Sequence, residues 1–217
     1  SLGRLLSKTL LLFLGLTVLL DWTLFALLLA VWGWLAIMTK EFFVPEWLKK
    51  RPLVYMVSHM AIMPLIDLYA TACDWWPAGY ALHEGFGLTL GAFLLLSLVN
   101  GTAIEIARKC WAPEQEREGV ETYSRLWKPG PAGVAVMGVV LVGLTLSAFI
   151  NVRSEAGIWF LGALLLISAW AAWCAIDYAG TPTPRTAKAI ETASGVFVLC
   201  NYLLLGVLPL VASLWLS

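Results

Sequence analysis

Long apolar runs constrain this chain more than any other feature of its sequence. Seven segments come close to the roughly 17–25 residues that an α-helix needs to cross a bilayer. They are Leu5–Leu20, Trp22–Met38, Leu53–Thr71, Phe86–Ala103, Ala132–Ile150, Gly157–Ile176 and Gly195–Leu216. Because lipid offers the backbone no hydrogen-bonding partner, such segments must be helical. We therefore expect an all-α, polytopic transmembrane helix bundle with seven helices, forming a single domain over residues 1–217.

Composition supports this class of protein. Of the 217 residues, 60% are apolar and 13% are charged, whereas soluble domains have about 45–50% and about 25%. The formal net charge is zero, so no overall positive field favours nucleic acid as a partner. The sequence holds no phosphate-binding Walker motif, HExxH, GxSxG or CxxC, which excludes several common enzyme classes.

Basic residues fall on one side of the membrane if the seven helices alternate in direction. Of the 14 basic residues, only Arg153 lands on the other side. By the positive-inside rule the basic side is cytoplasmic, which places the C-terminus and the segment Ala72–Gly85 outside. We expect a multi-pass protein of the cell inner (plasma) membrane, with its long basic loops in the cytoplasm.

The most informative polar stretch joins the fourth and fifth apolar runs. Glu105 precedes Arg108 and Lys109 by three and four residues, which places all three on one face of a helix. Pro113 should end that helix, and more acids follow it: Glu114, Glu116, Glu118 and Glu121. Carboxylates at a membrane surface suit Mg²⁺, which shares oxygen ligands with phosphates, and neighbouring cations suit the phosphate itself. A solvated, salt-bridged loop explains the same spacing equally well.

A second candidate lies in the inner loop Thr39–Arg51. Lys40 follows the second apolar run directly, where it could meet a diphosphate at the membrane surface. The cluster of aromatic and basic residues in this loop is also typical of a segment that lies among lipid headgroups. On the loop alone, the second interpretation is the stronger one.

A third candidate is the pair of ionisable residues in the third apolar run, His59 and Asp67. Such groups are costly inside a membrane and often mark a functional site. Eight residues correspond to about 12 Å along a helix, so the two side chains are not expected to contact each other. Pro64 between them is expected to kink the helix. Asp67 could point into the bundle, and His59 is equally explained as an interhelical hydrogen-bond partner.

The segment Glu105–Ser124 resembles the second acidic motif of the UbiA superfamily of intramembrane prenyltransferases. In that motif, spaced acids precede Gly-[Val/Ile]-x-Thr, which Gly119, Val120 and Thr122 match; Tyr123 and Ser124 replace the usual Leu-Pro, and Glu replaces the usual Asp. Two further stretches, MTKEFFVPEWL at Met38–Leu48 and LYATACDW at Leu68–Trp75, resemble a bacterial UbiA-like subgroup. The resemblance spans nearly the whole chain.

The resemblance implies a nine-helix fold of which this chain would supply the third to the ninth helix. It implies an enzyme that transfers alkyl groups other than methyl, moving an isoprenoid chain from a prenyl diphosphate to an unidentified acceptor with Mg²⁺ as cofactor. Glu105, Glu114 and Glu116 would bind the metal, and Lys40, Arg108 and Lys109 would bind the diphosphate. Glu105 and Asp67 would be the catalytic residues.

Family members also carry a first Asp-rich motif between their second and third helices, and this sequence contains no DxxxD. The resemblance therefore implies about two more helices and an Asp-rich loop upstream, without which the chain would be inactive. The main rival to an enzyme is a non-catalytic or transport-type membrane bundle that binds a lipid headgroup or a cation at the same cytoplasmic loop.

Overall fold

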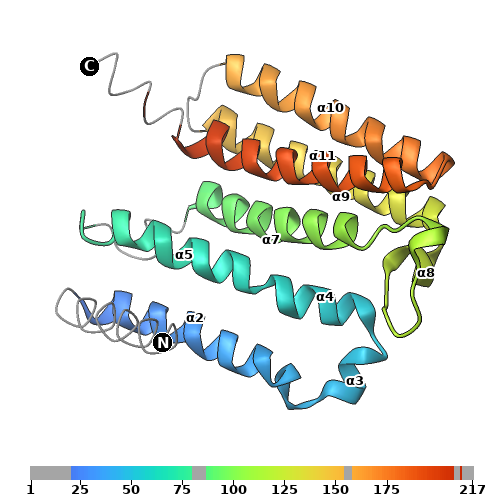
Figure 1. Ribbon diagram of the computed structural model, residues 1–217. Coiled ribbons are helices and arrows are strands. Elements are labelled where there is room, and N and C mark those ends of the chain that lie inside the picture. The colour runs from blue at the N-terminus through green and yellow to red at the C-terminus, as the bar shows by residue number, and fades with distance from the viewer. Residues whose placement is uncertain (1–20, 80–86, 154–157, 208–210, 212–217) are drawn as a thin grey trace, which may run out of the picture. The chain divides into compact units, whose positions relative to one another are not determined.

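The computed structural model describes residues 21–79, 87–153, 158–207 and 211, and every regular element among them is helical. The chain divides into two compact units, Ser1–Gly87 and Leu88–Ser217. In the first unit the elements are α2 (Trp22–Thr39), η1 (Glu41–Phe43), α3 (Pro45–Lys49), α4 (Pro52–Met60) and α5 (Ile62–Trp75) (Figure 1). In the second unit they are α7 (Leu88–Arg108), η2 (Pro113–Gln115), α8 (Tyr123–Trp127), α9 (Pro129–Arg153), α10 (Ile158–Gly180), α11 (Pro184–Tyr202) and the π-helical turn η3 (Leu203–Val207).

Six helical spans in the described part of the chain are long and apolar enough to cross a membrane. They are Trp22–Thr39, Pro52–Trp75, Leu88–Arg108, Pro129–Arg153, Phe160–Gly180 and Pro184–Val207. The predicted span Leu5–Leu20 lies outside the described residues. The described residues thus form only helices among their regular elements, and the chain is a multi-pass membrane protein.

The last span starts eleven residues earlier than its hydropathy predicts. Gly195 was expected to open it, but α11 begins at Pro184, so Arg185 and Lys188 belong to the helix instead of a preceding loop. Thr183 caps this helix by accepting a hydrogen bond from the backbone N–H of Thr186, and a proline at the first helical position suits such a start. The prediction was wrong because hydropathy detects the part of a helix that lies in lipid, whereas the helix itself starts at its cap.

In the first unit, α2 packs against α5. The Asp21 side chain caps the N-terminus of α2 by accepting hydrogen bonds from the backbone N–H groups of Thr23 and Leu24. A hydrogen bond from the Trp76 side chain, followed by the bond from Thr23, lowers the pKa of the Asp21 carboxyl group. This carboxylate therefore connects the start of α2 to the end of α5.

The third span is interrupted at Ala61, three residues before Pro64, where the sequence predicts a kink. Helix α4 ends at Met60 and α5 begins at Ile62. Pro64 has no N–H group to donate to the carbonyl oxygen of Met60 four residues earlier, and its ring crowds that carbonyl, which explains why the helix breaks there.

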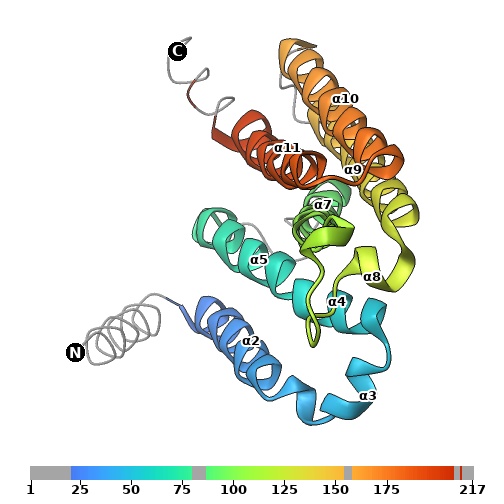
Figure 2. The ribbon, with the colours of Figure 1, turned by 45° about the vertical axis from the view of Figure 1, so that its right-hand side comes forward.

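In the second unit, four long helices run side by side in alternating directions (Figures 1 and 2). Glycine allows the closest approach: a Cβ atom added at Gly133 in α9 would lie 2.7 Å from the carbonyl oxygen of Ala175 in α10. The alternation places seven basic residues at the end where α7 stops and α11 starts, namely Arg108, Lys109, Arg117, Arg125, Lys128, Arg185 and Lys188. Arg153 lies at the opposite end of α9, so within this unit the predicted separation of basic residues is confirmed.

A buried polar network joins three of these helices. The hydroxyl group of Ser147 in α9 donates to Oδ1 of Asn201 in α11 at 2.7 Å, and Nδ2 of Asn201 donates to Oδ1 of Asn100 in α7 at 3.0 Å. All three side chains are buried. Polar side chains that satisfy each other in this way hold membrane helices together.

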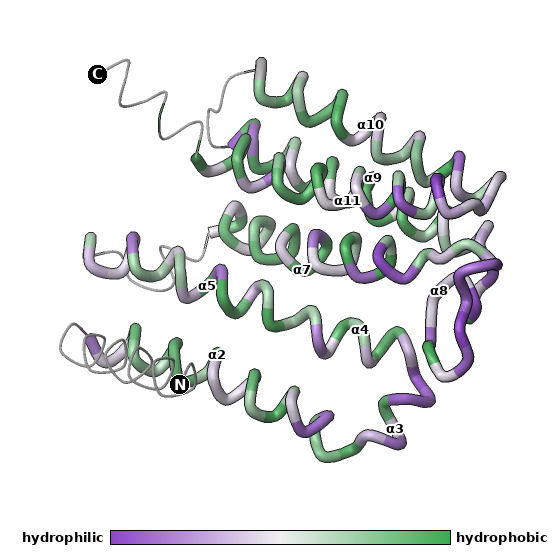
Figure 3. Tube along the Cα trace, viewed as in Figure 1, coloured by the Kyte–Doolittle hydropathy of each residue, from purple (hydrophilic) through white to green (hydrophobic). Residues whose placement is uncertain are grey.

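Hydrophilic residues of the second unit concentrate in the connection between α7 and α9 (Figure 3). The four long helices are coloured mostly as hydrophobic, which agrees with their function as membrane spans. The connection, residues 109–128, contains η2 and α8 and carries three of the candidate residues, Lys109, Glu114 and Glu116.

Candidate functional site

The end of α7 brings together a buried carboxylate and two cations. Glu105 is only 8% exposed. Its Oε2 atom lies 2.5 Å from a guanidinium nitrogen of Arg108, and its Oε1 atom lies 2.9 Å from Nζ of Lys109. The expectation that these three residues share one helical face is therefore confirmed.

Both cations remain accessible. The Arg108 side chain is 60% exposed and the Lys109 side chain is 33% exposed. Nζ of Lys109 also lies 5.6 Å from the centre of the Tyr123 ring, within the range of a cation–π interaction. Arg108 and Lys109 can therefore present positive charge to an anion, while Glu105 holds both side chains in place.

The connection that follows is folded around a second carboxylate. Glu116 accepts hydrogen bonds from the hydroxyl group of Thr122 at 2.7 Å and from that of Ser124 at 2.7 Å. The Thr122 hydroxyl also accepts a hydrogen bond from the backbone N–H of Arg125, which caps α8. Glu116, which the sequence pattern alone would describe as a solvated acid, thus organises the fold of its own loop.

Further hydrogen bonds attach this loop to the helices. The backbone N–H of Trp111 donates to the Ser124 hydroxyl at 2.9 Å, and the backbone N–H of Tyr123 donates to the carbonyl oxygen of Lys109 at 3.0 Å. From α10, the buried Tyr178 hydroxyl donates to the carbonyl oxygen of Trp111 at 2.8 Å. The loop is therefore held in place next to Arg108 and Lys109.

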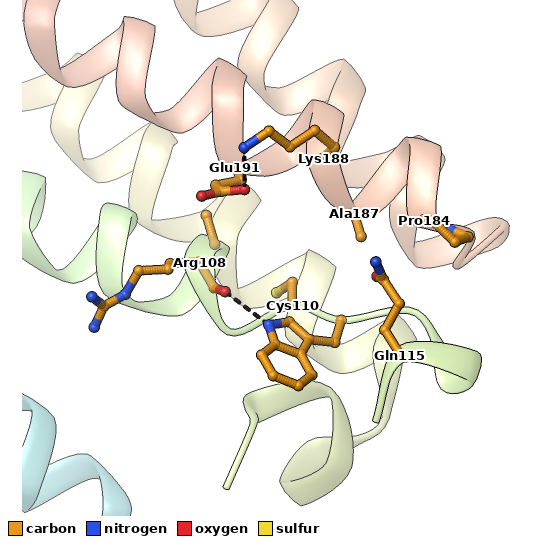
Figure 4. Close-up of a pocket in the computed structure, with 9 residues that line it drawn as sticks. Arg108, Cys110, Gln115, Pro184, Ala187, Lys188 and Glu191 are labelled. Atoms are coloured by element: carbon orange, nitrogen blue, oxygen red, sulfur yellow. Dashed lines mark hydrogen bonds and ion pairs between the residues drawn. The ribbon is translucent and has the colours of Figure 1, made fainter. Parts of the chain in front are cut away.

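A small cavity of about 100 Å³ lies between the end of α7 and the start of α11 (Figure 4). Its lining includes Cys110, Gln115 and the ion pair of Lys188 with Glu191, whose charged atoms are 2.9 Å apart. Figure 4 shows the Arg108 side chain extending away from that ion pair. Because ligand pockets usually measure about 300–1,000 Å³, this cavity is too small for an isoprenoid chain.

Burial makes Cys110 a structural residue. The side chain is 2% exposed, and this burial raises the pKa of the Cys110 thiol to about 12. A thiol with such a pKa is neutral at physiological pH and is a poor nucleophile and metal ligand.

The three acids predicted to bind magnesium do not gather at one point. In the described part of the chain, no group of three or more His, Cys, Asp or Glu side chains is placed to hold a metal ion. Glu105 is engaged by Arg108 and Lys109, Glu116 is engaged by two hydroxyl groups, and Glu114 is exposed. These residues do not fit a magnesium site built from protein carboxylates alone.

The remaining predicted residues belong to the first unit. Lys40 is exposed and follows α2 directly. Asp67 is half-buried in α5. His59 stacks on Tyr55 with ring centres 4.0 Å apart, and its Nδ1 atom lies 2.8 Å from the carbonyl oxygen of Tyr55, so the histidine is held within its own helix.

Sequence reasoning missed the residues that hold the loop. The sequence marks Thr122 and Ser124 only as part of the acidic motif, and it does not single out Tyr178. A signal for Tyr178 was present, since a phenol near the end of an apolar run needs a hydrogen-bond partner when it is buried. Comparison of this chain with family models, with curated proteins and with solved structures found no match.

Proposed function

We propose that this chain is an integral membrane prenyltransferase of the UbiA type, which moves an isoprenoid chain from a prenyl diphosphate to an acceptor. The observation that carries the proposal is the buried Glu105 carboxylate that fixes two accessible cations, Arg108 and Lys109, at the end of a membrane span. The resemblance of Glu105–Ser124 to the UbiA motif supplies the reaction class.

In this reaction the allylic C–O bond of the prenyl diphosphate breaks, and the diphosphate leaves with the bonding electrons. A bond forms between the acceptor and the allylic carbon, and the acceptor loses a proton. Arg108 and Lys109 would bind the diphosphate oxygens and stabilise the negative charge that grows on them as the bond breaks. Glu105 would hold both cations in place. Lys40 and Asp67 remain predicted participants from the first unit.

Magnesium dependence stays a prediction from the resemblance. Mg²⁺ commonly binds to one or two carboxylates together with substrate phosphates and water. The described acids do not fit a magnesium site built by the protein alone, so the steps above use only the cations of this chain.

The proposed orientation follows from the basic residues. Because they gather at the end of the second unit that carries the loop, we place that end in the cytoplasm of a cell with the protein in its inner (plasma) membrane. The C-terminus would then be external.

The test measures release of diphosphate from geranyl, farnesyl and geranylgeranyl diphosphate by the full-length gene product, with and without Mg²⁺. Binding of the same compounds is compared among Arg108→Gln, Lys109→Gln and the control Arg125→Gln. Arg125 is an exposed cation of the same loop whose guanidinium donates to the carbonyl oxygen of Arg117.

Each of the first two variants should weaken binding roughly tenfold, because a hydrogen bond to a charged group contributes about 1.5–3 kcal/mol and both cations are partly exposed. Arg125→Gln should change binding less than twofold. No release with any chain length, together with equal binding by all three variants, would favour the non-catalytic or transport-type bundle that binds a lipid headgroup or a cation at this loop.

A further inference from the structure

The loop between α2 and α4 carries a strained turn that exposes an aromatic side chain. Glu41, Phe42 and Phe43 have φ angles of 51°, 52° and 60°, in the left-handed region that non-glycine residues rarely adopt. Phe42 packs edge-on against Trp34 and His59, whereas Phe43 is 73% exposed. Within this turn, Phe42 therefore packs inward and Phe43 is exposed.

The short helix α3 continues the same pattern. Leu48 is 3% exposed and fixes α3 to the first unit, while the neighbouring Trp47 is 48% exposed. The Arg51 guanidinium lies 4.3 Å from the centre of the Trp47 ring, and Lys49 and Lys50 are exposed. In the described part of the chain, none of these three cations forms an ion pair, although Glu41 and Glu46 are nearby in the sequence.

The location of this loop is fixed by its neighbours. One membrane span ends at Thr39 and the next begins at Pro52, so residues 40–51 lie at a membrane surface. Exposed aromatic rings are favoured at the level of the headgroups. Lysine and arginine residues next to a span attract anionic lipids, and each such residue raises the affinity for these lipids about fivefold.

From these observations we infer that Phe43, Trp47, Lys49, Lys50 and Arg51 form a basic–aromatic surface that binds the headgroups of anionic phospholipids. The aromatic rings enter the headgroup layer, and the three cations bind lipid phosphates. Because Leu48 anchors α3, the cations are presented from a fixed element. This surface shares no residue with the group at Glu105, and the inference does not depend on the proposed enzymatic activity.

The test uses the full chain purified in a neutral detergent and titrated with phosphatidylglycerol or with phosphatidylcholine. Each lipid's apparent dissociation constant is obtained from the rise in the unfolding temperature. The test variant combines Lys49→Gln, Lys50→Gln and Arg51→Gln. The matched control combines Arg117→Gln, Arg125→Gln and Lys188→Gln, which removes three exposed cations from the second unit. Arg117 and Arg125 lie inside the connection between α7 and α9, and Lys188 is paired with Glu191.

The original chain should bind phosphatidylglycerol more tightly than phosphatidylcholine. The test variant should weaken phosphatidylglycerol binding roughly tenfold or more and leave phosphatidylcholine binding unchanged, whereas the control should change both by less than twofold. If the test variant unfolds at a lower temperature without lipid, Lys50→Gln alone replaces it, with an expected loss of about fivefold.

Three results would overturn the inference. The first is equal affinity of the original chain for the two lipids. The second is an equal loss in the test and control variants, which would mean that only total charge matters. The third is displacement of phosphatidylglycerol by an equal concentration of inorganic pyrophosphate, which would assign these cations to a diphosphate site.

Discussion

Replacing Gly133 with alanine should loosen the packing of α9 on α10. The new Cβ atom would lie 2.7 Å from the carbonyl oxygen of Ala175 and 2.8 Å from the Cβ atom of Ala179. Ordinary contacts begin near 3.4 Å, and a backbone oxygen cannot move aside without moving the helix. Overpacking of this kind costs about 1–3 kcal/mol. The higher helix propensity of alanine offsets about 0.5–1 kcal/mol of this cost, so we expect the free energy of unfolding to fall by about 1–2 kcal/mol.

Gly138 in the same helix provides a matched control. It is exposed, and a Cβ atom added there would meet no atom within 4 Å. Gly138→Ala should therefore leave the free energy of unfolding unchanged or raise it by up to about 1 kcal/mol. Both variants are unfolded by titrating sodium dodecyl sulfate into mixed micelles, and helix content is followed by circular dichroism. Equal midpoints for Gly133→Ala and Gly138→Ala would refute the argument that glycine is needed for this close approach.

Three further predictions concern the loop and its surroundings. Glu105→Gln should lower turnover at least tenfold in an assay of diphosphate release, because Arg108 and Lys109 lose their charged partner. The control Glu121→Gln changes an exposed acid and should alter turnover less than twofold. Similar small effects of both variants would argue for a solvated loop. In intact cells that carry the additional change Cys73→Ala, which removes an exposed native thiol, an impermeant maleimide should label Ala78→Cys and miss Glu118→Cys if the basic end is cytoplasmic. The reverse pattern would contradict the proposed orientation. In detergent at pH 8, the maleimide should react with Glu118→Cys and leave native Cys110 unlabelled, because burial raises the pKa of the Cys110 thiol to about 12. Ready labelling of Cys110 would mean that the loop opens.

The same thiol gives stability a defined dependence on pH. The folded pKa of Cys110 is raised above its ordinary value of 9.0 to about 12, so the unfolded chain releases this proton first as pH rises. The contribution of the neutral thiol to stability is therefore complete below about pH 9 and is lost between about pH 9 and pH 12.

The sequence predicted those parts of the fold that depend on local pattern. The second apolar run was expected at Trp22–Met38, and α2 occupies Trp22–Thr39. The pairing of Glu105 with Arg108 and Lys109 followed from helical spacing alone. Such features need only the geometry of one helix.

Features that depend on distant contacts could not be predicted. Asn100 and Asn201 are 101 positions apart, and only the packing of α7 on α11 brings their side chains together. Likewise, nothing local distinguishes Glu116, whose carboxylate accepts hydroxyl hydrogen bonds, from exposed Glu114, two residues earlier. For the three acids predicted to bind a metal, spacing shows which residues are close in sequence but not where their oxygen atoms point.

The network of Asn100, Ser147 and Asn201 has a mechanical consequence for the second unit. Successive residues of an α-helix are turned by about 100°, so rotating any one of the three helices by a single position would leave amide groups without partners in lipid. Sliding one helix along another would do the same. The hydrogen bonds among these three side chains therefore resist rotation and sliding of α7, α9 and α11 relative to one another.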